Sequence, residues 1–172
     1  EQLRRALVAM GCQWHEKVVH VSFGRVHGMS IRKGNVVFLD DVLNEASERA
    51  KEKMLEDGSG RDVDIDSICE QVGIGGIIFG DLKNLRTSDY TFEWKEILNT
   101  KGFTGICVQY AHARCCSILK KGGGAPDIGE ADLNFLTAPE EASLVKEIGK
   151  IPQAVEAAAN DLEPSKLARA LY

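Results

Sequence analysis

A short segment, residues 28–34, holds the side chains in this chain that are best suited to chemistry. It begins and ends with glycine, and Ser30, Arg32 and Lys33 lie between. Glycines allow backbone conformations in which several N–H groups point at one anion, and the two cations add charge beside it. The segment therefore predicts a loop that stabilises developing charge on a phosphate. A solvated turn with two surface charges is the alternative interpretation.

The flanking sequence predicts strands on both sides of this loop. Residues 18–24 are almost continuously apolar and lead into it, and the apolar residues 36–39 lead out of it. Such runs are typical of central strands in a parallel sheet. Asp40 and Asp41 follow, where carboxylates can cap the next helix and favour its positive end. They can also bind magnesium, but capping explains them with fewer assumptions.

Apolar spacing predicts helices through much of the remaining chain. Residues 3–10 have a helical pattern, and Asp64 or Asp66 can cap a short helix that runs to Val72. Residues 73–80 are apolar and rich in glycine, but their glycines lack phosphate-loop spacing, so close helix packing explains them better. In the helix after Asp41, the expected core face consists of Val42, Leu43, Ala46, Ala50 and Met54.

The predicted helix over residues 104–121 has two distinct faces. Its expected core face consists of Val108, Ala111, Cys115, Ile118 and Leu119. At 100° per residue, a different face holds four residues within about 60° of one another: Tyr110, Arg114, Ser117 and Lys121. An aromatic ring with two cations at helical spacing is typical of an RNA-facing stripe. An ordinary surface face, with a snorkelling arginine, is the alternative.

The last third of the chain is predicted to be helical. A glycine-rich loop at residues 122–127 ends the preceding helix, and Thr137 with Glu140 forms a capping box for the next one. The predicted strands are confined to the first 40 residues. The fold class is therefore α/β over residues 1–100, followed by an all-α part over residues 101–172.

Composition limits the class of protein. The 172 residues are 44% apolar and 27% charged, which is sufficient for a folded core. A net charge of −5 argues against a general nucleic-acid binder, although clustered cations can still bind phosphate. The five cysteines are scattered without zinc-ligand spacing, so we expect a reducing compartment and no metal site. Without a signal peptide or a bilayer-length apolar run, we expect a soluble cytoplasmic protein with no membrane contact.

Four segments resemble the same family. Residues 19–43 read V-H-V-S-F-G-R-V-H-G-M-S-I-R-K-G-N-V-V-F-L-D-D-V-L and closely resemble the signature-loop region of arginyl-tRNA synthetases. Residues 90–94 resemble the segment just before that family's anticodon-binding domain. Residues 105–114 resemble the start of that domain, and residues 163–172 resemble one of its helices. The resemblance covers nearly the whole chain, in order.

The resemblance implies a class I aminoacyl-tRNA synthetase, a ligase of protein biosynthesis. Such an enzyme activates arginine with ATP, accompanied by Mg²⁺, and transfers it to tRNA(Arg). The implied architecture is the C-terminal part of a Rossmann-like, nucleotide-binding catalytic domain over residues 1–100, then part of a helical anticodon-binding bundle over residues 101–172. The resemblance also implies that the full enzyme is a monomer.

By the same resemblance, residues 28–34 are a relative of the K-M-S-K-S loop that closes over the ATP phosphates. Ser30 would hold the shape of the loop, while Arg32 and Lys33 would neutralise charge as pyrophosphate leaves. The implied ATP-binding residues, with the stretch from Phe23 to Val26 near the adenine, are Phe23, Gly24, Val26, Gly28, Met29, Ser30, Arg32 and Lys33. Gly28 stands at the position of the first lysine of K-M-S-K-S, as is common in this family. Ile31 stands where threonine is usual, and Ile106-Cys107-Val108 replaces the usual Pro-Tyr-Leu.

The sequence also predicts a fragment. The family's H-x-G-H motif is absent from the 172 residues, and both ends of the chain fall within helical patterns. We therefore expect no aminoacylation from this chain alone. The alternative is a non-enzymatic tRNA-binding module or truncated synthetase paralogue, with Tyr110, Arg114 and Lys121 as its tRNA-binding residues.

Overall fold

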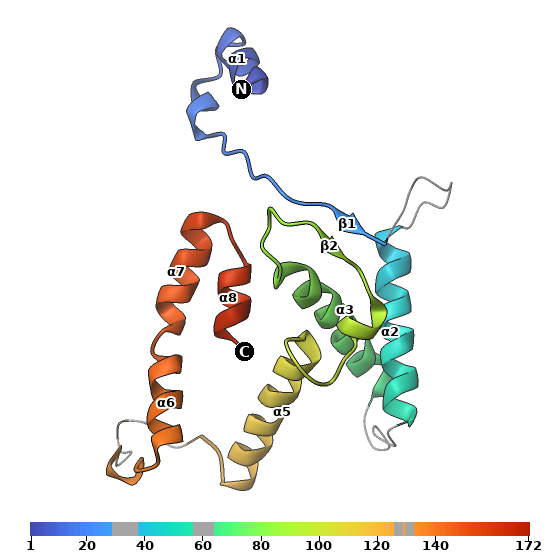
Figure 1. The fold of residues 1–172 in the computed structure, drawn as a ribbon, viewed down its shortest axis with the longest axis vertical. Helices are drawn as coiled ribbons and strands as arrows, with labels where there is room; N and C mark the ends of the chain where they lie inside the picture. Colours follow the sequence, from blue (N-terminus) through green and yellow to red (C-terminus); the bar gives the residue numbers. More distant parts are fainter. Residues whose placement is uncertain (29–37, 57–63, 126–128, 130–132) are drawn as a thin grey trace.

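The computed structural model describes residues 1–28, 38–56, 64–125, 129 and 133–172. Within these ranges the protein is mostly helical, with one short parallel pair of strands (Figure 1). The elements, in chain order, are α1 (Gln2–Ala9), η1 (Gln13–Lys17), β1 (Val26–His27), α2 (Leu39–Glu56), α3 (Ile65–Leu82), β2 (Tyr90–Thr91), α4 (Trp94–Ile97), α5 (Gly105–Lys121), η4 (Leu133–Phe135), α6 (Pro139–Ile148), α7 (Ile151–Asp161) and α8 (Ser165–Ala170).

Helix α3 is the centre of the packed region, because it contacts α2, α4, α5 and α8. As predicted, Asp64 caps it, with the Ser67 amide donating to the carboxylate at 3.4 Å. The prediction that the helix is short and ends at Val72 is wrong, because it continues through the glycine-rich stretch to Leu82. Glycine weakens a helix in isolation, but contacts with four neighbouring helices outweigh that local preference.

The predicted role of these glycines in close packing is confirmed. A Cβ atom at Gly73 would lie 2.7 Å from the backbone carbonyl of Ala46 on α2. At Gly80 it would lie 3.2 Å from the Ile97 side chain on α4. The missing side chains therefore let α3 approach the backbone of one neighbour and the apolar side chain of another.

Helix α2 presents the predicted core face to α3. Val42, Ala46 and Ala50 are buried, and the two remaining predicted members, Leu43 and Met54, are half-buried. The helix begins at Leu39, before both of the predicted capping residues. Asp40 and Asp41 therefore lie in its first turn, where they can still favour the positive end of the helix, and are not its cap.

The predicted strand over residues 18–24 is wrong, because this segment lies outside any helix or strand. It connects the α1–η1 pair to β1 (Figure 1), and Val19, Val21 and Phe23 along it are exposed. Backbone pairing makes a strand, and in the described part of the chain only the end of this segment has such a partner. At that end the Gly24 amide donates to the Arg86 carbonyl. Beyond it, in β1, Val26 pairs in parallel with Tyr90, and His27 pairs with Thr91.

The second predicted strand is wrong where it can be observed. Residues 36 and 37 lie outside the described ranges, whereas Phe38 precedes a helix and Leu39 begins it. The loop predicted at residues 122–127 is confirmed at its start, because α5 ends at Lys121 and Gly123 and Gly124 have φ values of +92° and +114°. Such values favour glycine.

The predicted core face of α5 is also wrong. Val108 is half-buried, but the four members further along, Ala111, Cys115, Ile118 and Leu119, are exposed. Only the first turns of α5 pack against α3, where Gly105 lies against the backbone of Gly75 and Gly76. The helix itself is confirmed, with Thr104 as its cap.

The last helices form a smaller packed unit in which α7 lies against α8, and α8 in turn contacts α3. The predicted capping box of Thr137 with Glu140 is wrong, because the N-cap is Ala138, whose side chain has no acceptor, and only the reciprocal half of a box forms. The Ala138 amide donates to the Glu141 carboxylate at 2.9 Å, so the pair is not Thr137 with Glu140. No helix in the described ranges combines the length and apolar character needed to cross a bilayer.

Candidate functional site

The structure describes half of the ATP-binding residues predicted from the sequence. Phe23, Gly24, Val26 and Gly28 are described and lie along the stretch that contains β1. The other four, which include all three predicted catalytic residues, lie outside the described residues: Met29, Ser30, Arg32 and Lys33. The structure therefore shows how the chain leads into residues 28–34.

This stretch is held by backbone hydrogen bonds to the chain that follows α3. The Gly24 amide donates to the Arg86 carbonyl oxygen at 2.7 Å. Further along, the Tyr90 amide donates to the Arg25 carbonyl at 3.0 Å, and the Phe92 amide donates to the His27 carbonyl at 2.9 Å. The three bonds fix both the position and the direction of residues 24–27.

Asp89 adds a side-chain clamp to these backbone bonds. Its Oδ1 accepts from the Arg25 amide at 2.8 Å, and its Oδ2 lies 3.2 Å from Nε2 of His27. An ionised carboxylate can only accept, so Nε2 carries the hydrogen in this contact. The hydrogen bond from the Arg25 amide, followed by that from His27, lowers the pKa of the Asp89 carboxyl. Asp89 is thus held as an anion at the base of the predicted phosphate loop.

Two glycines in this stretch are required by the geometry. A Cβ atom at Gly24 would overlap the Ser88 carbonyl oxygen. Gly28 has a φ of +92°, and a Cβ atom there would lie 3.1 Å from the Phe92 carbonyl oxygen. At Gly28 only glycine adopts the backbone conformation without strain.

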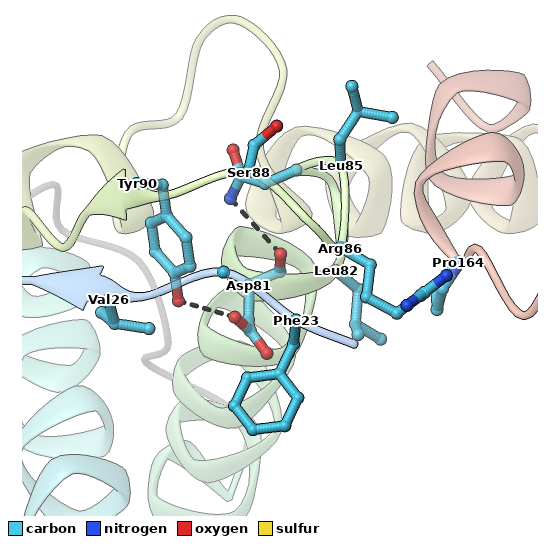
Figure 2. A pocket seen from close by; sticks show the side chains of 11 residues that line it. Phe23, Val26, Asp81, Leu82, Leu85, Arg86, Ser88, Tyr90 and Pro164 are labelled. Carbon is cyan, nitrogen blue, oxygen red and sulfur yellow. Dashed lines mark hydrogen bonds between the residues drawn. The ribbon is translucent and has the colours of Figure 1, made fainter. Parts of the chain in front are cut away.

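A hollow of about 260 Å³ lies beside the same stretch, and Phe23, Asp81, Arg86, Tyr90 and Pro164 contribute to its lining (Figure 2). The Tyr90 hydroxyl donates to Oδ1 of Asp81 at 2.6 Å. Burial, together with this hydrogen bond to a carboxylate, raises the pKa of Tyr90. The Phe23 side chain is 83% exposed, so its ring can stack on a planar group.

The predicted RNA-facing residues lie on the exposed part of α5. Tyr110 is 61% exposed, and the guanidinium carbon of Arg114 lies 5.9 Å from the centre of its ring. Lys121, the last residue of the helix, is also exposed. All three side chains are therefore accessible on one helix, with the first two in contact.

Asp89 and Arg86 are missing from the sequence-based prediction of the site. Their partners on the β1 side lie 62 to 64 residues away along the chain. Neither residue lies in one of the four segments that resemble the family. A single sequence carries no local signal for such long-range pairing.

Comparison with known families gives a direct match. A family model described as tRNA synthetases class I (R), catalytic domain, matches residues 6–94, which is more than half of the chain. The chain belongs to this family. A second family model, the DALR anticodon binding domain, matches residues 108–172 of this synthetase chain. The resemblance seen in the sequence is thereby confirmed.

Individual relatives agree with the family match. An arginine–tRNA ligase of Lactobacillus delbrueckii subsp. bulgaricus is 40% identical over 98% of this chain and 30% of its own length. A probable cytoplasmic arginine–tRNA ligase of Dictyostelium discoideum is 36% identical over 99% of this chain and 29% of its own length. The solved Thermus thermophilus arginyl-tRNA synthetase matches with a TM-score of 0.78 and 33% identity, over 98% of this chain and 28% of that structure. The chain spans about 30% of the length of the curated relatives it matches.

Proposed function

We propose that this chain is part of an arginine–tRNA ligase, which activates arginine with ATP and transfers it to tRNA(Arg). The observation that carries the proposal is the continuous match of 98% of the chain to arginine–tRNA ligases in both sequence and fold. The substrates follow from those relatives, which are arginine–tRNA ligases. A cytoplasmic location and a monomeric complete enzyme belong to the same proposal, and the Dictyostelium relative supports the location.

In this proposal residues 28–34 act on the ATP phosphates. The ring of Phe23 and the backbone of Gly24 and Val26 lie beside the adenine. Mg²⁺ accompanies ATP as part of the substrate. Arg32 and Lys33 neutralise the charge of the leaving pyrophosphate, while Ser30 and the glycine backbone shape the loop. The hydrogen bonds that fix residues 24–27 support the proposal, because a loop that binds phosphate needs a rigid base.

The test of the loop is Lys33→Ala in the complete protein. Removing one fixed cation from the transition state is expected to raise the barrier by about 3 kcal/mol, which slows arginine activation about 100-fold. Pyrophosphate exchange measures activation, and filter binding measures the affinity for tRNA, which is expected to change little. Lys95→Ala, which removes an exposed lysine before α5, is the matched control. Equal losses of activation and of tRNA affinity would refute the role of the loop.

The proposed architecture is a Rossmann-like catalytic part over residues 1–100 and part of an anticodon-binding bundle over residues 101–172. The gap between the two family matches, from residue 95 to residue 107, supports a boundary near residue 100. The match of residues 6–94 to the catalytic-domain family supports the first of these parts. For the 172-residue chain alone we expect no aminoacylation, because it contains no H-x-G-H motif.

A tRNA-binding role for α5 is the second candidate, and the exposure of Tyr110, Arg114 and Lys121 favours it. Helix α5 would bind tRNA in this way both in a complete enzyme and in a non-enzymatic binding module. The test is a gel shift of the 172-residue chain with tRNA at rising salt concentrations. Binding is expected to fall steeply with salt, and the double variant Arg114→Ala, Lys121→Ala is expected to flatten that slope by about two.

A double variant with the same charge change, Arg49→Ala with Lys95→Ala, is the control for this experiment, because both residues lie outside α5. It is expected to keep the wild-type salt slope. Equal slopes in the two double variants would contradict a specific role for α5. Arginine-dependent pyrophosphate exchange by the complete protein separates the ligase from a non-enzymatic module.

A further inference from the structure

Arg86 lies where three parts of the chain meet. Its backbone carbonyl accepts from the Gly24 amide, and its Nη1 donates to the Ser22 carbonyl oxygen. Its Nε donates to the carbonyl oxygen of Leu162, at the turn between α7 and α8, at 2.9 Å. Figure 2 shows the Arg86 side chain reaching from the loop after α3 towards Pro164. One residue thus ties the stretch before β1 to the C-terminal helices.

The C-terminal side of this junction is firmly built. Glu163 is only 9% exposed, and both of its carboxylate oxygens accept from the Arg86 amide at 3.2 Å. The fully buried Ser165 hydroxyl donates to Glu163 at 2.8 Å. Leu162 has a φ of +51°, a left-handed conformation that is uncommon outside glycine and costs about 1 kcal/mol or more. The turn is therefore held in one specific conformation.

The charges at the junction favour the same arrangement. Burial alone would raise the pKa of the Glu163 carboxyl, but hydrogen bonds from Ser165 and from the Arg86 amide outweigh it and leave the pKa lowered. A buried carboxylate is tolerated only where its hydrogen bonds are made. Glu163 thus fixes the backbone of Arg86, while the guanidinium reaches two carbonyl groups in different segments.

We propose that Arg86 is a positioning residue, through which the C-terminal helices place the segment of Ser22 to Val26 at the nucleotide site. The inference rests on the proposed function, in which Phe23, Gly24 and Val26 lie beside the adenine of ATP. Arg86 itself touches no part of that nucleotide in this scheme. Its side chain acts on ATP binding through Ser22, while its backbone carbonyl holds Gly24.

An arginine suits this position better than a lysine. The planar guanidinium carries several donors in a fixed arrangement, so that one group bonds the carbonyls of Ser22 and Leu162 together. Arg86→Ala removes these two bonds and a longer one, 3.5 Å, from Nη1 to the Ser22 hydroxyl. The backbone bonds of residue 86 to Gly24 and Glu163 do not depend on its side chain, so the variant separates positioning from the general packing of the loop.

The test uses the complete protein that contains this chain, with Arg86→Ala and the control Arg49→Ala. Arg49 is an exposed arginine whose ion pair lies within α2, so its loss removes the same charge away from the junction. In Arg86→Ala the KM for ATP is expected to rise about tenfold, a typical size for coupling between two sites, while the Kd for tRNA stays within about twofold. An ATP KM equal to that of the wild type overturns the inference. If Arg86 had a purely structural role, its loss would instead weaken the binding of ATP and of tRNA together.

Glu163→Gln tests the origin of the effect in the C-terminal helices, because Glu163 has no contact with residues 22–26 in the described hydrogen bonds. Glu163→Gln is expected to raise the KM for ATP as well. The KM for ATP of the double variant Arg86→Ala, Glu163→Gln is expected to be no higher than that of the more affected single variant. Independent effects that multiply in the double variant would refute a shared route. Glu163→Gln also keeps the inference testable if Arg86→Ala fails to fold.

Hydrogen exchange separates this inference from the proposed function. Deuterium uptake at residues 22–28, measured without ATP or tRNA, is expected to be faster in Arg86→Ala than in the wild type and in Arg49→Ala. If the wild-type protein does not charge tRNA, the proposed function fails, but faster uptake still supports the placement of this segment by Arg86. Unchanged uptake in Arg86→Ala overturns the placement, whatever the activity.

Discussion

Helices α3 and α5 are similar in length, yet they are packed very differently. α3 contacts four other helices and has buried residues from Cys69 to Gly80. α5 packs only through its first turns, and residues 110–121 are all exposed. The apolar residues of α5 have the spacing of a core face, whereas α3 is interrupted by glycines. Spacing thus predicts that a helix forms, but the shape of its neighbours decides which part of it is buried.

The largest expected difference between the two regions comes from deleting an isoleucine in each. Ile97, the last residue of α4, is 8% exposed and lies against the glycines of α3. Ile118 on α5 is 64% exposed. Ile97→Ala is expected to lower the free energy of unfolding by about 3 kcal/mol, since it leaves a cavity. Ile118→Ala is expected to lower it by less than about 0.5 kcal/mol. Urea unfolding followed by circular dichroism measures both, and equal losses would show that the distal part of α5 is buried in solution.

Adding a methyl group to a glycine sharpens the same comparison. Gly73→Ala places a Cβ atom 2.7 Å from backbone atoms of α2, which forces α2 and α3 apart. The expected cost is about 2 kcal/mol, more than the gain of about 1 kcal/mol in helix propensity. At Gly122, where α5 ends, φ is −80° and the nearest atom lies at 3.5 Å, so Gly122→Ala is expected to be almost neutral. A neutral Gly73→Ala in the same urea unfolding assay would contradict the close approach of α2 and α3.

The smallest expected effect concerns the clamp at Asp89 and its dependence on pH. The pKa of this carboxyl is lowered in the folded protein from an ordinary value of 3.8. Its charged form therefore stabilises the fold above about pH 4, and this contribution is lost as the pH falls through the lowered value. Asp89→Asn is expected to lower the urea midpoint at pH 7, with a smaller difference from the wild type at pH 3. Glu156→Gln, an exposed carboxyl on α7, controls for the loss of one charge, and a difference that grows in acid would contradict the sign.

The local features of the fold were largely predictable. The helices at residues 3–10 and 104–121, the cap at Asp64 and the core face of α2 all follow from spacing and capping chemistry within a few residues. The failures share a cause. A strand at residues 18–24 requires a neighbouring strand, and a buried face on α5 requires a packed neighbour. The described part of the chain places no strand beside residues 18–24, and residues 110–121 of α5 are exposed.

The sequence by itself determined the family, through the order and specificity of its motifs, and it predicts which side chains act on a phosphate. It also determined where most helices begin, because capping and helical spacing are local properties. Only the tertiary structure decided what holds the base of that loop. Arg86, Asp89 and Glu163 act on residues far away along the chain, and such contacts exist only when the chain is folded. Their hydrogen bonds depend on distances in space, which residue type and spacing do not record.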